Sequence, residues 1–333
     1  MRIRLGLLVI LFMLVAAGGI AWLGIDRGGR FTLAERVENA LRMPFERTDI
    51  PAGATAPAQK ARHVPAQRLA PLVVDLHSWM TAETQLSGQP EALVTAVRRA
   101  GWNYIRPALL GPNGNPDACC GERVIAAIEA AIRHARQNGP VLEDAIFVVG
   151  ESGGGFSALC FLLGSTMPVR GVFAWAAITD LVAWHREQAG TRYAEGIERC
   201  TGSKDQLNVS EALRRSPAHM AIVRHGNYPV TRLYAGIHDG WRGATPITHS
   251  IDFFNRLASQ WEPAKVISAS EILALLRRSA PGGAERPLAS RQPVHFLREA
   301  GPMQLVIYEG AHEMLTAQVI ADIREIAGTA LPP

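Results

Sequence analysis

The chain has 333 residues, of which 48% are apolar and 19% are charged, and its formal net charge is +4. This composition is typical of a folded globular protein and excludes a disordered chain. No dense basic run stands beside aromatic residues, so the sequence gives no support for nucleic-acid binding.

The N-terminus carries a long apolar segment. Two arginines precede an uncharged run at residues 5–25. As a helix this run is about 31 Å long, which is enough to cross the hydrocarbon core of a bilayer. We therefore expect residues 1–28 to be a membrane anchor, with a cleaved signal peptide as the alternative, because Val15-Ala16-Ala17 resembles a cleavage site. Both interpretations predict that the rest of the chain lies on the extracytoplasmic (periplasmic) side.

The four cysteines also fit an oxidising compartment, because their number is even. Cys119 and Cys120 are adjacent and are not expected to bond each other, but one of them could pair with Cys200. Cys160 occupies an apolar position of a predicted helix, so we expect it to be an unbonded core residue. Four free thiols are the alternative.

Residues 29–68 are expected to form a linker and N-terminal segment, because residues 51–58 are rich in proline, glycine and alanine. From residue 69 to 333, short apolar runs alternate with helical patterns. Strands are predicted at residues 71–76, 103–110, 145–149, 171–178, 229–235 and 303–308, and helices at 91–100, 122–137 and 153–163. This alternation predicts a single α/β domain with a mostly parallel central sheet and helices on both faces. Functional sites of such sheets lie at the carboxyl ends of the strands.

A glycine-rich turn follows one of these strands. Gly150-Glu151-Ser152-Gly153-Gly154 stands between the buried run 145–149 and the helix predicted at 153–163. In that context G-x-S-x-G is the turn that exposes a nucleophilic serine, and the helix N-terminus favours developing negative charge. The sequence therefore predicts Ser152 as a nucleophile. A dinucleotide-binding fingerprint is a weaker alternative, because it should start directly after the strand.

A serine hydroxyl needs a base, and the base needs an acid that fixes its tautomer. Among ten histidines, His312 directly follows the last predicted strand, so it is the predicted general base. Asp239 follows the preceding strand, 229–235, and is the predicted acid. Asp180 is the alternative acid, although it could instead cap a helix.

The oxyanion of an acyl-transfer intermediate needs backbone N–H donors. Gly153, directly after the nucleophile, should supply one of them. The loop after residue 76 should supply the other, from Trp79 or, as the weaker choice, from Ser78. The cysteines lack zinc spacing, and no second histidine follows His312 at the spacing of a metalloprotease. The sequence thus predicts neither a metal nor a cofactor.

With these residues identified, the chain resembles the α/β-hydrolase superfamily, and within it single-domain serine hydrolases related to prolyl oligopeptidases (peptidase S9-like) and carboxylesterases. The resemblance is carried by Leu76-His77-Ser78-Trp79, by residues 150–155 and 235–240, and by Gly310-Ala311-His312-Glu313. It implies triad roles for Ser152, Asp239 and His312, in the chain order that this superfamily uses. Ser78 stands where many relatives have glycine. Only about 70 residues precede the first predicted strand, so we expect no propeller domain.

Residues 181–228 lie where such folds insert a small cap. We expect His77, Trp184 and Trp241 to contact the substrate. The predicted function is a serine hydrolase that cleaves a carboxylic ester through an acyl-enzyme. A prolyl-oligopeptidase-like serine peptidase is the first alternative, and a catalytically inactive anchored binding protein is the second. The expected partners are a small-molecule ester or short peptide, and a membrane through the N-terminal segment.

Overall fold

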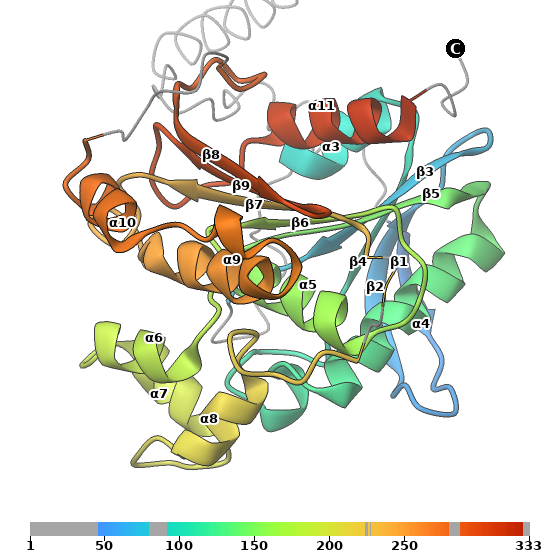
Figure 1. Cartoon of the computed structure of the whole chain (residues 1–333). Coiled ribbons are helices and arrows are strands. Elements are labelled where there is room, and N and C mark those ends of the chain that lie inside the picture. The colour runs from blue at the N-terminus through green and yellow to red at the C-terminus, as the bar shows by residue number, and fades with distance from the viewer. Residues whose placement is uncertain (1–45, 80–91, 224–225, 227, 280–286, 329–333) are drawn as a thin grey trace, which may run out of the picture.

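The computed structural model describes residues 46–79, 92–223, 226, 228–279 and 287–328 (Figure 1). The predicted anchor lies outside these residues. Within the described part of the chain, no helix is long and apolar enough to span a bilayer.

One mixed sheet organises the described residues, with the strand order β1-β2-β4-β3-β5-β6-β7-β9-β8. The six central strands are parallel: β4 (Asn103–Pro107), β3 (Ala70–Leu76), β5 (Val141–Glu151), β6 (Gly171–Trp175), β7 (Val230–Gly236) and β9 (Met303–Tyr308). β1 (Glu46–Ile50), β2 (Gln59–Val64) and β8 (Val294–Ala300) add antiparallel edges. The central strands are buried on both faces, as expected where a parallel sheet is covered by helices.

Helices cover both faces of the sheet (Figure 1). α3 (Ala92–Arg99) and α11 (Thr316–Ala327) pack on one face, while α4 (Glu122–Asn138), α5 (Gly153–Gly164) and α9 (Thr248–Trp261) pack on the other. The sequence of α4 explains its packing on the sheet. Val124, Ile128 and Ile132 recur every four residues, so they form one apolar side of the helix, and all three are fully buried against the sheet. α10 (Ala269–Leu276) lies between α9 and β8 in the chain.

A cap of three short helices is inserted between β6 and β7. It comprises α6 (Leu181–Glu187), α7 (Arg192–Cys200) and α8 (Val209–Arg215), and it has its own apolar cluster around Trp184 and Ile197. These three helices lie within residues 181–228, the segment for which we expect a cap.

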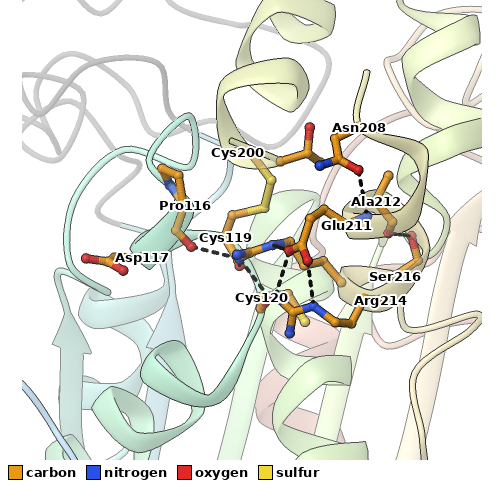
Figure 2. Close-up of polar contacts among 12 residues, drawn as sticks. Pro116, Asp117, Cys119, Cys120, Cys200, Asn208, Glu211, Ala212, Arg214 and Ser216 are labelled. Atoms are coloured by element: carbon orange, nitrogen blue, oxygen red, sulfur yellow. Dashed lines mark hydrogen bonds and ion pairs between the residues drawn. A yellow bond between two sulfur atoms is a disulfide. The ribbon is translucent and has the colours of Figure 1, made fainter. Parts of the chain in front are cut away.

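One disulfide attaches this cap to the loop at Cys119 and Cys120, and a second disulfide fixes that loop to the core of the domain. Cys119–Cys200 joins the loop after the 3-10 turn Pro116–Ala118 to the end of α7 (Figure 2). Cys120–Cys160 joins the same loop to α5. The guanidinium of Arg215, at the end of α8, donates to the carbonyl oxygen of Cys119 and to Glu211 Oε2. The cap is therefore anchored by one disulfide at α7 and by polar contacts at α8.

The structure confirms most predicted elements and differs from the sequence prediction at three points. Residues 46–64 are not a linker, because β2 pairs with β4 and extends the sheet by a hairpin. β8 was not predicted. A partner for Cys200 among the vicinal pair is confirmed, since it bonds Cys119, whereas Cys160 is buried but not unbonded, since it bonds Cys120. The pairing of β2 with β4 and the Cys120–Cys160 bond each depend on a partner that is distant in sequence, whereas β8 pairs with β9, the next strand in the chain.

Candidate active site

Ser152 occupies the sharp turn between β5 and α5. Its φ of 57° and ψ of −115° are strained for a residue with a Cβ atom. The surrounding packing imposes this conformation: Ser152 N donates to Trp175 O at 2.8 Å, and a Cβ on Gly150 would lie 2.2 Å from the carbonyl carbon of Gly154. Only glycine at position 150 allows the strand and helix to approach this closely. The turn thus has the geometry that the glycine-rich motif predicts.

His312 and Asp239 meet at the carboxyl ends of β9 and β7, which are neighbouring strands. His312 Nδ1 donates to Asp239 Oδ2 at 2.8 Å. Asp239 Oδ1 accepts from the amides of Gly240 (2.9 Å) and Thr245 (3.1 Å), so the carboxylate orientation is fixed on both oxygens. The Asp239 side chain is fully buried, while 18% of the His312 side chain is exposed. This pair leaves His312 Nε2 as the nitrogen that can take a proton.

The electrostatics of the pair favour a protonated imidazole. Burial lowers the pKa of His312, but the hydrogen bond and charge of Asp239, together with the charge of Glu151, outweigh burial and raise the pKa. A base whose charged form is stabilised is suited to receive a proton during a reaction. The structure contains no hydrogen bond between Ser152 and His312; such bonds often tighten only when substrate is bound.

The predicted oxyanion donors lie side by side. A Cβ on Gly153 would be only 2.3 Å from Trp79 N, so the two backbones are in direct contact. Among the described residues, neither of these two amides donates to a protein acceptor. The Ser78 hydroxyl is used elsewhere, because it donates to Glu151 O at 3.2 Å. The arrangement offers two neighbouring N–H groups at the N-terminus of α5.

The three residues expected to contact a substrate have different positions. His77 is almost fully buried, and its ring nitrogens lie 2.9 Å from Ser78 O and 3.3 Å from Ala108 O. Trp184 is completely buried, and its indole N–H donates to Ala244 O at 2.8 Å. Both side chains are buried in this structure, and their contact with a substrate stays a prediction. Trp241 is 75% exposed, with the Arg278 guanidinium over its ring.

Packing and hydrogen bonds show what the side chains of Trp79 and Asp180 do. The Trp79 ring packs against Trp184, with ring centroids 4.9 Å apart, so its side chain belongs to the core under the cap. Asp180 accepts from Val182 N at 2.8 Å and caps α6. Its other oxygen faces His219 and not His312. The helix-capping alternative therefore describes Asp180 correctly.

Two residues near the site were missed by sequence reasoning. Glu151 Oε2 accepts from Met314 N at 3.2 Å, which brings its carboxylate to the loop that carries His312. A Cβ on Gly243 would lie 2.2 Å from Asp239 Oδ1 and 2.4 Å from His312 Cβ. The variable position of G-x-S-x-G could have singled out Glu151, but no local pattern marks Gly243. Among the described residues, no group of three or more His, Cys, Asp or Glu side chains is arranged to hold a metal ion.

Comparisons with known proteins give structural matches only. No protein-family model matches the chain, and no curated protein sequence matches it. One similar solved structure is prolyl oligopeptidase B from Galerina marginata, a D661A mutant bound to a 25mer macrocyclization substrate (TM-score 0.52, 13% identity). Another is a puromycin-hydrolyzing peptidase of Mycobacterium tuberculosis (TM-score 0.50, 15% identity). The alignments cover 85% of this chain and 36% and 38% of those chains, respectively.

The chain has an α/β-hydrolase fold. The parallel sheet with helices on both faces and the similarity to both peptidases agree on this assignment. The chain spans little more than a third of the length of these two neighbours. At this level of identity the likeness establishes the α/β-hydrolase fold, of the type seen in prolyl oligopeptidases, while activity must be argued from the site.

Proposed function

We propose that this α/β-hydrolase-fold protein is a serine hydrolase that works through an acyl-enzyme on Ser152. The observation that supports it most is the combination of a strained serine turn with a His312–Asp239 pair at the same edge of the sheet. Each feature alone has a structural explanation, but a reactive alcohol, an oriented imidazole and two neighbouring amides together are the parts that acyl transfer requires.

The chemistry assigns one task to each group. His312 Nε2 accepts the proton of Ser152 as Oγ attacks the substrate carbonyl, and Asp239 stabilises the resulting imidazolium. The amides of Gly153 and Trp79 bind the negative oxygen of the tetrahedral intermediate. Collapse of this intermediate transfers the proton from His312 to the leaving group, and a water molecule then repeats the sequence on the acyl-enzyme.

The fold neighbours favour a peptide substrate over the carboxylic ester that the sequence reading placed first. One is a prolyl oligopeptidase bound to a 25mer macrocyclization substrate, and the other is a puromycin-hydrolyzing peptidase. We therefore propose a short peptide as the substrate, with a small ester as the alternative. The discriminating experiment compares short p-nitrophenyl acyl esters with p-nitroanilide peptides, including peptides that end in proline. Ester turnover without peptide turnover would reverse this order.

Labelling with a fluorophosphonate probe tests the proposal itself. The wild-type protein should form a covalent adduct whose mass maps to Ser152. Ser152→Ala should remain unlabelled while keeping the thermal unfolding midpoint of the wild type. If folded wild-type protein is not labelled, the inactive binding protein becomes the better explanation.

We also propose that the domain works outside the cytoplasm. All four cysteines are paired in disulfides, which persist mainly in oxidising compartments, and the apolar N-terminal segment is compatible with export. Membrane attachment through that segment stays a prediction. Rapid alkylation of the protein in its native cells, followed by mass spectrometry, should find no alkylated cysteine. Alkylation of all four would contradict the proposed compartment.

A further inference from the structure

Glu151 is an acidic residue that the proposed triad does not use. It directly precedes Ser152 at the end of β5. The residue is half-buried, and burial is the main reason that its pKa is raised; the nearby charge of His312 and the hydrogen bond from Met314 N act in the opposite direction. Placing a carboxylate in such surroundings costs free energy unless its charge is used. Its position therefore calls for a physical reason.

Glu151 connects three of the segments that build the site. Its backbone is continuous with Ser152. Its carbonyl oxygen accepts from Ser78 Oγ at 3.2 Å, which holds the loop that carries Trp79. Its carboxylate accepts from Met314 N at 3.2 Å, and Met314 lies two residues after His312. One side chain thus connects the nucleophile turn to the loop of the base.

The carboxylate lies on a small cavity between β3, β4, α3 and the His312 loop. The cavity is lined by Asp75, Leu76, Ser78, Ala92, Leu93, Arg106, Glu151, Met314 and Thr316. The Asp75 carboxylate already has partners there, because Arg106 and the Tyr104 hydroxyl both donate hydrogen bonds to its Oδ2. Arg106 is therefore engaged with Asp75, and the described contact that fixes the Glu151 carboxylate is the amide of the His312 loop.

We propose that Glu151 is a positioning residue of the active site, which fixes the His312 loop through Met314 N and stabilises the imidazolium by its negative charge. The inference deepens the proposed function and rests on it. The raised pKa of His312 supports this role. Burial lowers that pKa, whereas the hydrogen bond and charge of Asp239 raise it, and the charge of Glu151 raises it further. Asp239 orients the ring from the Nδ1 side, whereas Glu151 acts through the loop and through space.

Other ionisable groups face Glu151 and must be considered with it. They are Asp75 on β3, Arg106 on β4, Tyr308 at the end of β9, Asp239 after β7 and His312 itself. Asp75 and Asp239 oppose ionisation of Glu151, while His312 favours it. The effect of Glu151 on His312 must therefore be measured by a substitution at position 151 alone.

Two substitutions separate the two parts of the role. Glu151→Gln retains an oxygen that can accept from Met314 N but removes the charge. It should move the acidic limb of the kcat/KM profile to lower pH with little change in KM. Glu151→Ala also removes the hydrogen bond, so it should lower kcat by about 10²-fold, the cost of a base displaced by about 1 Å.

Histidine-selective NMR measures the electrostatic part without requiring turnover. The full chain carrying Ser152→Ala is labelled at histidine, and the His312 signal is assigned as the one absent from a His312→Gln variant. Adding Glu151→Gln should lower the measured pKa of His312. Glu299→Gln, which removes a charge on the edge strand β8, should leave it unchanged.

The outcomes separate this inference from the proposed function. An unchanged His312 titration in Glu151→Gln, or a Glu151→Ala variant with wild-type kcat, would overturn the role of Glu151. Absence of fluorophosphonate labelling would overturn the hydrolase proposal while leaving the titration readable. A Glu151→Ala variant that fails to fold does not remove the test, because Glu151→Gln preserves the hydrogen bond and is judged by its titration.

Discussion

Gly243 offers a sharp test of the site, because it packs directly on the His312–Asp239 pair. A Cβ at this position would be 2.2 Å from Asp239 Oδ1 and 2.4 Å from His312 Cβ. Real Cβ contacts are essentially never shorter than 3.0 Å, so the Asp239 contact alone must open by at least 3.0 − 2.2 = 0.8 Å. The Gly243 backbone lies outside the left-handed region, so alanine adds this clash without strain in φ. A misplacement of about 1 Å costs about 10²-fold in rate.

Gly243→Ala should therefore lower kcat/KM and the rate of fluorophosphonate labelling by about 10²-fold while the protein stays folded. Gly53→Ala is the matched control, because a Cβ there meets no atom within 4 Å. Labelling kinetics and circular dichroism on both variants distinguish local displacement from unfolding. A folded Gly243→Ala protein that reacts within about threefold of the wild-type rate would refute the placement of the pair.

Three further predictions follow from the same structure. Asp239→Asn should reduce kcat by about 10⁴-fold through the wrong imidazole tautomer, and a larger kinetic loss in Asp180→Asn would show that the acid is misassigned. Replacing Cys119 and Cys200 by serine opens a bridge with a sequence separation of 81, which should cost about 4 kcal/mol in guanidinium unfolding; an unchanged midpoint would contradict this. Burial raises the pKa of Glu309, but hydrogen bonds from two histidines outweigh it and hold the pKa below its ordinary value of 4.5. Glu309→Gln should therefore lower the free energy of unfolding by its full amount above pH 4.5, and by less as pH falls through the lower folded-state pKa. Equal losses in the free energy of unfolding at pH 7 and in acid would argue against this prediction.

The parts of the site that sequence predicted are those with a local signature. Ser152 was identifiable because a strand, a glycine-rich turn and a helix are consecutive in the chain. His312 and Asp239 were identifiable because each follows a strand, and parallel strands end at one edge of a sheet. The hydrogen bond between them, and the role of Asp180 as a helix cap, needed coordinates, because several acids and histidines follow strands in this sequence.

Side-chain direction was the weak point of the sequence reading. Trp184 and Trp241 are both tryptophans that we expect to contact the substrate, yet Trp184 is fully buried and Trp241 is 75% exposed. Their difference comes from the neighbours that each ring meets across the fold, such as Ala244 O for the Trp184 indole. The packing of Gly243 on Asp239 and His312 was invisible for the same reason.

The sequence by itself determined the α/β architecture, the buried central strands and the serine turn, because hydrophobic periodicity and glycine placement act over a few neighbouring residues. Only the tertiary structure decided the edges and the cross-connections. β1, β2 and β8 mix polar and apolar residues and exist because a neighbouring strand offers hydrogen bonds. The pairing of Cys160 with Cys120 and the contact of Glu151 with Met314 likewise depend on segments that meet only after folding.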